Sequence, residues 1–228
     1  MELLHHSTDS ATRQLLLNAA LKIFAERGYA ATSVNEIVTA ARVSKPVLYY
    51  YFADKADLFQ ALVDRAHDER LRLMQKAAVR GATVAEKLED VVSAMFEFSH
   101  ENVELMRLAF ATAFASPGEA PGHAKCREKG RRNYEFVKAL IEKGMKAGEL
   151  ATQFTADEMA MSIYGQLNSY AMLRVLCPEI PVNRQSARQI VKLYLSGASA
   201  RPKTGSQIKA NGHPLARVRR AAKHHSRS

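Results

Sequence analysis

Three consecutive tyrosines, at positions 49–51, follow the tripeptide Ser44-Lys45-Pro46 within one short segment. Tyrosine hydroxyls and lysine ammonium groups hydrogen-bond to phosphate oxygens, and tyrosine rings pack on sugars or on thymine methyl groups. Leu48 and Phe52 are four residues apart, so both lie on one face of a helix and can be buried together. The segment is typical of a helix that presents aromatic and basic side chains to nucleic acid. The alternative is that the tyrosines only pack against neighbouring helices.

A second short helix is expected immediately before this segment. Residues 33–36, Ser-Val-Asn-Glu, form a capping box, which is typical of a helix start. The apolar face of this helix is formed by Ile37, Val38 and Ala41. After a break at residues 42–43, Ser44 can cap the next helix, and Pro46 is tolerated in its first turn. Two short helices joined by a brief turn form a helix-turn-helix, in which the second helix enters the major groove of DNA.

The same start and stop signals recur along the chain to about residue 197. The first helix is expected over about residues 12–27, where apolar side chains recur at helical spacing and Gly28 follows as a C-cap. A later helix is expected over about residues 124–148. The expected N-caps of the other helices are Asp54, Thr83, Asn102, Thr155 and Asn183. No segment alternates apolar and polar residues as a half-buried β-strand does, so the sequence predicts an all-α fold of nine helices.

The positive charge of the chain is concentrated at its C-terminus. The sequence has 33 Lys and Arg against 23 Asp and Glu, but residues 201–228 hold eight of the basic residues and none of the acidic ones. This segment cannot bury enough apolar surface to offset its ordering entropy, so we expect it to be disordered. The expected organisation is a DNA-binding domain over residues 10–55, with the helix-turn-helix at about 33–52. A second helical domain follows over 56–198, and then a basic tail over 199–228.

The sequence argues against several classes of protein. No apolar stretch is long enough to span a membrane, and the N-terminus lacks the basic and apolar regions of a signal peptide. Cys126 and Cys177 lie far apart without a zinc-binding pattern, which favours the reducing cytoplasm. The histidine pairs at 5–6 and 224–225 lack a third ligand at metal spacing. No nucleophile elbow, Walker loop or dinucleotide fingerprint is present, so we expect neither an enzyme nor a cofactor.

A dense set of residues at fixed spacings extends from the first helix to the start of the fourth. It comprises the stretch from Arg13 to Tyr29, the groups Thr32-Ser33-Val34 and Glu36-Ile37, then Val43-Ser44-Lys45, Leu48 to Phe52, and Asp54-Lys55. Over about residues 12–59 this set resembles the tetracycline-repressor (TetR) family. The resemblance implies a homodimer of all-helical subunits in which helices one to three bind a palindromic DNA operator. It also implies that the other helices bind a small-molecule inducer and form the dimer, usually in a repressor.

By this resemblance, two sets of residues contact DNA. The base-facing residues are Lys45, Pro46 and Tyr49, and the phosphate-facing residues are Thr32, Ser33, Ser44, Val47, Tyr50, Tyr51 and Lys55. Arg42 departs from the family, which commonly has Gly in this turn. If the position requires a positive φ, Arg adopts it at some cost, and its charge is then available to a phosphate. Pro46 also stands where family members have Gly, so the resemblance leaves the base preference open.

The resemblance places a ligand pocket among helices four to eight, and we expect a mostly apolar ligand there. The candidate pocket residues are Phe96, Met106, Arg107, Phe110, Phe114, Tyr164, Gln166 and Asn168. The alternative is that such residues only fill a core. The last two helices carry apolar stripes that must be buried, which predicts a four-helix contact between two subunits. The residues expected in this dimer interface are Ala160, Ile163, Leu167, Ala171, Ile190, Leu193 and Tyr194.

Three functions remain to be compared. A ligand-gated repressor in the cytoplasm has double-stranded DNA, a second copy of itself and a largely apolar inducer as partners. The second function is that of an enzyme with a helical pocket, and the absence of a catalytic motif in the sequence argues against it. An architectural protein would bind DNA of any sequence through the basic tail, which is otherwise a solvated extension without a role. The helix-turn-helix favours the repressor.

Overall fold

The computed structural model describes residues 2–116, 119–180 and 182–198, and it confirms an all-α fold for them. Nine helices occupy these ranges. Their bounds are α1 Glu2–Arg27, α2 Val34–Ala41, α3 Lys45–Tyr51, α4 Lys55–Ala78, α5 Val84–Glu101, α6 Val103–Phe114, α7 His123–Lys146, α8 Ala156–Leu176 and α9 Arg184–Ala198. The basic tail expected over residues 199–228 lies outside the described residues. None of the described helices is long and apolar enough to cross a membrane.

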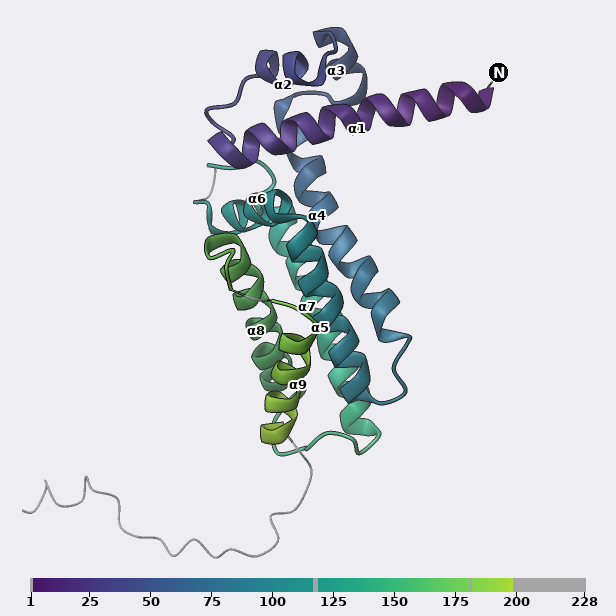
Figure 1. Ribbon diagram of the computed structural model, residues 1–228, viewed down its shortest axis with the longest axis vertical. Helices are drawn as coiled ribbons and strands as arrows, with labels where there is room; N and C mark the ends of the chain where they lie inside the picture. The colour runs from purple at the N-terminus through teal and green to yellow at the C-terminus, as the bar shows by residue number, and fades with distance from the viewer. Residues whose placement is uncertain (1, 117–118, 181, 199–228) are drawn as a thin grey trace, which may run out of the picture.

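The helices form two units that share α4 (Figure 1). Helices α1, α2 and α3 make a small unit at one end of the molecule, and α1 lies across the end of the larger bundle. Helix α4 begins against α1 and then runs along the bundle, where it packs on α5 and α7. Helix α6 contacts α1, α4 and α8, so it joins the two units a second time.

Two clusters of buried apolar side chains hold this arrangement together. The first joins the small unit to the first half of α4 and to α6, and includes Leu16, Phe24, Leu48, Leu58 and Met106. The second lies among the rest of α4 and helices α5, α7, α8 and α9, and includes Met74, Leu88, Phe96, Ile141 and Ile163. The first cluster continues across residue 55, where a domain boundary was expected. The two units are therefore packed together rather than joined by a flexible linker.

Most of the helix starts read from the sequence use the expected side chains. Ser33, Thr83 and Thr155 each form a complete capping box with the Glu three residues later. The Asp54 carboxylate accepts a hydrogen bond from the Asp57 N–H at 2.8 Å and so caps α4. Gly28 follows α1 with a φ of 77°, the left-handed conformation that favours glycine.

Three local predictions are wrong. Helix α1 begins at Glu2 rather than near residue 12, because no helix-breaking residue interrupts the segment before it. Ser44 stands at the N-cap of α3 in extended backbone, but its side chain makes no capping hydrogen bond. Asn102 starts α6 without a side-chain cap, since its amide instead donates to the Phe98 carbonyl at 3.0 Å and closes α5.

Arg42, in the turn between α2 and α3, has a φ of 55° and a ψ of 41°. It is the one residue other than glycine with a positive φ among those described. The left-handed conformation costs a residue with a β-carbon about 1–2 kcal/mol. Two hydrogen bonds from its N–H, to the carbonyls of Thr39 and Val38, hold this turn in place. Arg42 therefore occupies a position that glycine would occupy without strain.

We expect Arg42→Gly to raise the free energy of unfolding by up to about 1 kcal/mol, because relief of the left-handed strain exceeds the added entropy of the unfolded chain. Urea denaturation followed by circular dichroism measures the change. Arg42→Ala is the matched control, since it removes the same charge but keeps the β-carbon. Equal stabilities of the two variants would show that the backbone at this turn is not strained.

Candidate functional site

The outer face of α3 is exposed as the sequence predicted. Leu48 and Phe52 are 0% and 2% exposed and fix the inner face in the first core cluster, whereas Tyr49 is 50% and Tyr50 75% exposed. The rings of Tyr50 and Tyr51 make an edge-to-face contact at 4.9 Å between centroids. Large exposed aromatic side chains on a short helix are the exception in proteins and mark a contact surface.

The start of α3 is surrounded by exposed polar and basic side chains, which are typical of a surface that binds a polyanion. Lys45 and Pro46 in its first turn are exposed, and so is Ser44. Pro46, Val47 and Tyr50 line a shallow surface hollow together with Arg42. Arg42 is exposed, so its guanidinium group adds positive charge to the surface beside the start of α3.

Thr32 and Lys55 do not have the roles expected for them. Thr32 is 2% exposed, and its hydroxyl donates to the Gly28 carbonyl at 2.7 Å. The Lys55 ammonium group donates to the carbonyls of Tyr29 and Thr32 at 3.0 and 2.9 Å, and it lies 4.2 Å from the centre of the Tyr29 ring. Both groups therefore bind the loop between α1 and α2 rather than facing solvent. This corrects the expectation that they contact phosphate.

The residues expected to line a ligand pocket lie in different places. Phe96 and Met106 are fully buried but belong to separate core clusters. Phe114 is 77% exposed at the end of α6, and Arg107 is exposed on the same helix. Phe110, Tyr164 and Asn168 are half-buried. The expected residues therefore do not all lie together, because the prediction depended on residue type and could not tell which side of α5 or α6 faces inward.

The larger unit contains a group of buried polar side chains that the sequence analysis did not predict. His67 and Arg70 lie on α4, and Asn133 lies on α7. The Arg70 guanidinium donates to the Asn168 amide oxygen at 2.9 Å, and the Asn133 amide donates to the His67 carbonyl at 3.1 Å. A signal for them exists in the sequence, since positions 67 and 70 continue the spacing of the buried Val63 and Met74 on one face of α4.

Burial and nearby positive charges determine the state of His67. Desolvation and then the charges of Arg70 and Lys129 lower the pKa of His67 to about 4, so the ring is neutral at pH 7. Its Nε2 lies 3.3 Å from the Cys126 sulfur, and burial raises the pKa of that thiol. The acidic groups of α4 are engaged further out, where Lys129 pairs with Asp64 at 3.2 Å and with Asp68 at 2.7 Å.

Most of the expected dimer interface is buried within one protomer. Six residues of the predicted set are under 9% exposed and pack in the protomer's own core: Ala160, Ile163, Leu167, Ala171, Ile190 and Tyr194. Leu193 alone of the set is exposed, at 72%. The cause is that α8 carries apolar residues on both sides. Its inner stripe faces α5 and α7, so the prediction chose the wrong side.

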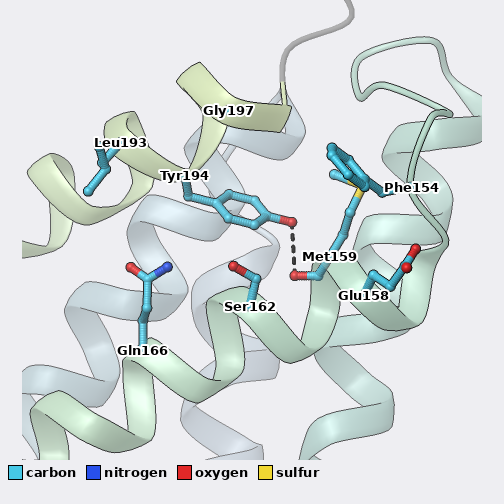
Figure 2. Close-up of a pocket in the computed structure, with 8 residues that line it drawn as sticks. All are labelled: Phe154, Glu158, Met159, Ser162, Gln166, Leu193, Tyr194 and Gly197. Atoms are coloured by element: carbon cyan, nitrogen blue, oxygen red, sulfur yellow. Dashed lines mark hydrogen bonds between the residues drawn. The ribbon is translucent and has the colours of Figure 1, made fainter. Parts of the chain in front are cut away.

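Figure 2 shows residues of α8 and α9 that line a hollow on the outer side of these two helices. A hollow of about 500 Å³ lies between the two helices, lined by Phe154, Glu158, Met159, Ser162, Gln166, Leu193, Tyr194 and Gly197. The Tyr194 hydroxyl donates to the Met159 carbonyl at 3.1 Å and forms its floor. Gln166 thus lies in this outer hollow and not inside the bundle, where the sequence predicted a ligand pocket. Phe154, Met161, Leu176 and Leu193 add exposed apolar surface on this side.

The lowered pKa of His67 predicts a pH dependence of stability. Because the unfolded chain, with a histidine pKa near 6.5, binds a proton more readily than the folded protein, stability is lost as the pH falls from about 6.5 to about 4. The loss from this residue reaches up to about 3 kcal/mol. Urea denaturation of the wild type and His67→Gln at several pH values measures it as the difference between the two proteins, which cancels the other titrating groups. A difference that stays constant from pH 7 to pH 4.5 would contradict a neutral His67.

Comparison with known proteins identifies the small unit. A family model described as bacterial regulatory proteins of the tetR family matches residues 16–62. The chain is 29% identical over 135 residues to the transcriptional activator FasR of Mycolicibacterium smegmatis, in a match that covers 59% of this chain and 62% of FasR. It is 26% identical to the transcriptional repressor BepR of Brucella suis, over 70% of this chain and 78% of BepR. The matched region thus spans less than two thirds of the length of FasR but more than two thirds of the length of BepR.

Solved structures share the arrangement of helices. FadR of Bacillus subtilis, solved with stearoyl-CoA, superposes with a TM-score of 0.69 at 21% identity, over 81% of this chain and 98% of FadR. The ketosteroid regulator KstR2 of Mycobacterium tuberculosis superposes with a TM-score of 0.63 at 21% identity, over 82% and 94% of the two chains. The protein therefore carries, over residues 16–62, the DNA-binding domain of the tetR family of bacterial regulatory proteins. It is a DNA-binding transcriptional regulator with a helix-turn-helix and not an enzyme.

Proposed function

We propose that the protein is a repressor that works on DNA in the cytoplasm, binds a palindromic operator as a homodimer, and is released by a small, largely apolar inducer. The observation that supports it most is the exposed face of α3 above the buried Leu48 and Phe52. Repression agrees with relatives such as BepR, although FasR is named as an activator. An apolar inducer agrees with the stearoyl-CoA of FadR and with the ketosteroid regulator KstR2.

In this proposal residues 10–55 form the DNA-binding domain and residues 56–198 the ligand-binding and dimerisation domain. The base contacts come from Lys45, Pro46 and Tyr49, at the exposed start of α3. The phosphate contacts come from Ser33, Ser44, Val47, Tyr50 and Tyr51, and we add Arg42 to them. Thr32 and Lys55 are left out because their polar groups are used inside the protein.

The dimer in this proposal forms through the outer side of α8 and α9. Met161, Leu176 and Leu193 are large exposed apolar side chains, and exposed apolar patches of this kind are typical of subunit contacts. A two-fold axis through this surface relates two copies of α3, which accounts for an operator with two inverted half-sites. The hollow in Figure 2 then receives side chains of the second copy.

Replacing Tyr49 by Ala should weaken binding to the preferred operator by about 1–3 kcal/mol and reduce discrimination between bases at one position. Arg42→Ala should weaken binding to all sequences about equally and lower the slope of log affinity against log salt by about 1, as the loss of a phosphate contact does. Operator duplexes are obtained by selection from a random pool, and fluorescence anisotropy measures affinity at several salt concentrations.

Val79→Ala is the control for these variants, because Val79 is exposed at the end of α4, away from α3. It should bind like the wild type. The selected duplexes should contain an inverted repeat. Selection of no common sequence by the wild type would contradict sequence-specific regulation, and unchanged binding by both variants would contradict the contacts assigned to α3.

Leu193→Asp should weaken the dimer at least about tenfold, since a carboxylate buried in an apolar contact loses its hydration. Sedimentation velocity at several protein concentrations measures the effect. Val79→Asp places the same charge on an equally exposed apolar side chain outside this surface and should leave the dimer intact. A Leu193→Asp protein that dimerises like the wild type would move the interface to another surface.

A further inference from the structure

Arg70 is a buried cation in the middle of α4. The residue is only 5% exposed. Its one hydrogen bond among the described residues goes to the Asn168 amide oxygen at 2.9 Å. The Asn168 amide nitrogen donates to the Tyr164 carbonyl at 3.0 Å, which turns the amide oxygen toward Arg70. An amide oxygen offers one acceptor to a group with five N–H donors and a full charge.

Among the described residues, no carboxylate forms an ion pair with Arg70. Of the acidic residues shortly before it on α4, Asp64 and Asp68 pair with Lys129 on α7, and the adjacent Glu69 pairs with Arg72. His67, one turn before Arg70, is neutral at pH 7 and adds no negative charge, and its lowered pKa is itself partly due to Arg70. An uncompensated buried charge costs several kcal/mol.

Two other buried polar atoms on α4 and α7 have no hydrogen-bond partner among the described residues. His67 Nδ1 and Asn133 Oδ1 are buried and make no hydrogen bond within the protein. His67 lies against α7, where its Nε2 contacts the Cys126 sulfur and its ring faces Gly130. The Tyr164 hydroxyl lies 3.5 Å from the Gly130 carbonyl, so α4, α7 and α8 meet at this level. The great majority of buried polar atoms in proteins have a hydrogen-bond partner, and a bound water or ion is one explanation for an atom without a partner in the protein.

The surroundings of this polar group are apolar. Val63 and Met74 flank it along α4, and Leu167 and Ala171 flank Asn168 on α8, all of them buried. A few polar groups within an apolar lining are typical of a small-molecule site. Arg70 carries one permanent positive charge, and the amide and imidazole groups around it are neutral. A ligand with one negative charge would balance it. A phosphate, with a charge near −2, would remain under-compensated here, whereas a carboxylate is neutralised.

From this geometry we propose that the inducer is an apolar carboxylic acid whose carboxylate binds Arg70, with Asn168 holding the guanidinium group in place. The proposal rests on the function proposed above, since it names the chemical class of the inducer. The carboxylate accepts two N–H donors of Arg70, and the apolar body of the ligand lies among the side chains of α4, α7 and α8. Arg70 is also fifteen residues after Lys55, so the ligand contacts α4 about 22 Å from the start of that helix in the DNA-binding unit.

Isothermal titration calorimetry on the full-length protein without DNA tests the proposal. The probes are straight-chain fatty acids from butanoate to dodecanoate, the alcohols of the same lengths, and dodecyl phosphate. The wild type should bind at least one acid ten or more times tighter than its alcohol. Arg70→Gln should lose about 10- to 100-fold in affinity for that acid, as expected when a charge-assisted pair is removed, and little for the alcohol.

Arg72→Gln is the matched control, since Arg72 lies on the same helix, is exposed and pairs only with Glu69. It should bind the acid like the wild type. Arg70→Gln should fold at least as stably as the unliganded wild type, because it removes an uncompensated buried charge. Thermal unfolding checks this point. A loss of affinity in a folded variant is then due to the missing charge.

Four results would overturn the inference: no binding of any acid, equal affinity for an acid and its alcohol, tighter binding of dodecyl phosphate than of the acids, or an Arg70→Gln variant that binds the acid like the wild type. Binding of the selected operator duplex by the unliganded wild type is measured in parallel. Failure of the acids while operator binding persists counts against the carboxylate site alone. Failure of operator binding counts against the proposed function.

Discussion

The ammonium group of Lys55 binds the carbonyl oxygens of Tyr29 and Thr32 where α4 leaves the small unit. Hydrogen bonds from a cation are stronger than those between neutral groups, and these two tie the loop after α1 to the first turn of α4. Since α4 has 24 residues, it extends about 36 Å, and its far half is packed in the second core cluster. The junction at Lys55, together with the first core cluster, therefore fixes the small unit relative to the larger bundle.

Features that depend on neighbouring residues could be predicted from the sequence. The capping boxes at Ser33, Thr83 and Thr155 use side chains three residues apart, and no distant contact competes with them. The inner and outer faces of α3 could also be predicted, because a helix of seven residues in a small unit has one side to bury. The left-handed turn at Arg42 was anticipated from the glycine that the family has there, and the φ of 55° confirms that the position requires it.

Features that depend on packing between distant helices could not be predicted. Helix α8 is apolar on two sides, and only the contacts with α5 and α7 determine that Ile163 and Leu167 face inward while Met161 faces outward. Thr32 and Lys55 were assigned by resemblance, which transfers a residue's role without its surroundings. Arg70 was missed because charged residues are expected on the surface, and its burial becomes visible only when α7 and α8 cover that face of α4.

The buried Arg70 would give the proposed release by an inducer a physical basis. A protein that keeps an uncompensated charge inside loses stability, and such costs persist mainly where function requires them. A ligand that neutralises the charge favours whichever arrangement of α4, α7 and α8 brings Arg70 and Asn168 around its carboxylate. Because Lys55 fixes the start of α4 to the α1–α2 loop, the proposal implies that a shift of α4 at Arg70 is passed on to the small unit that carries α3. In the proposed dimer, the two copies of α3 must match the spacing of two half-sites, so a small shift in each would weaken binding to the operator.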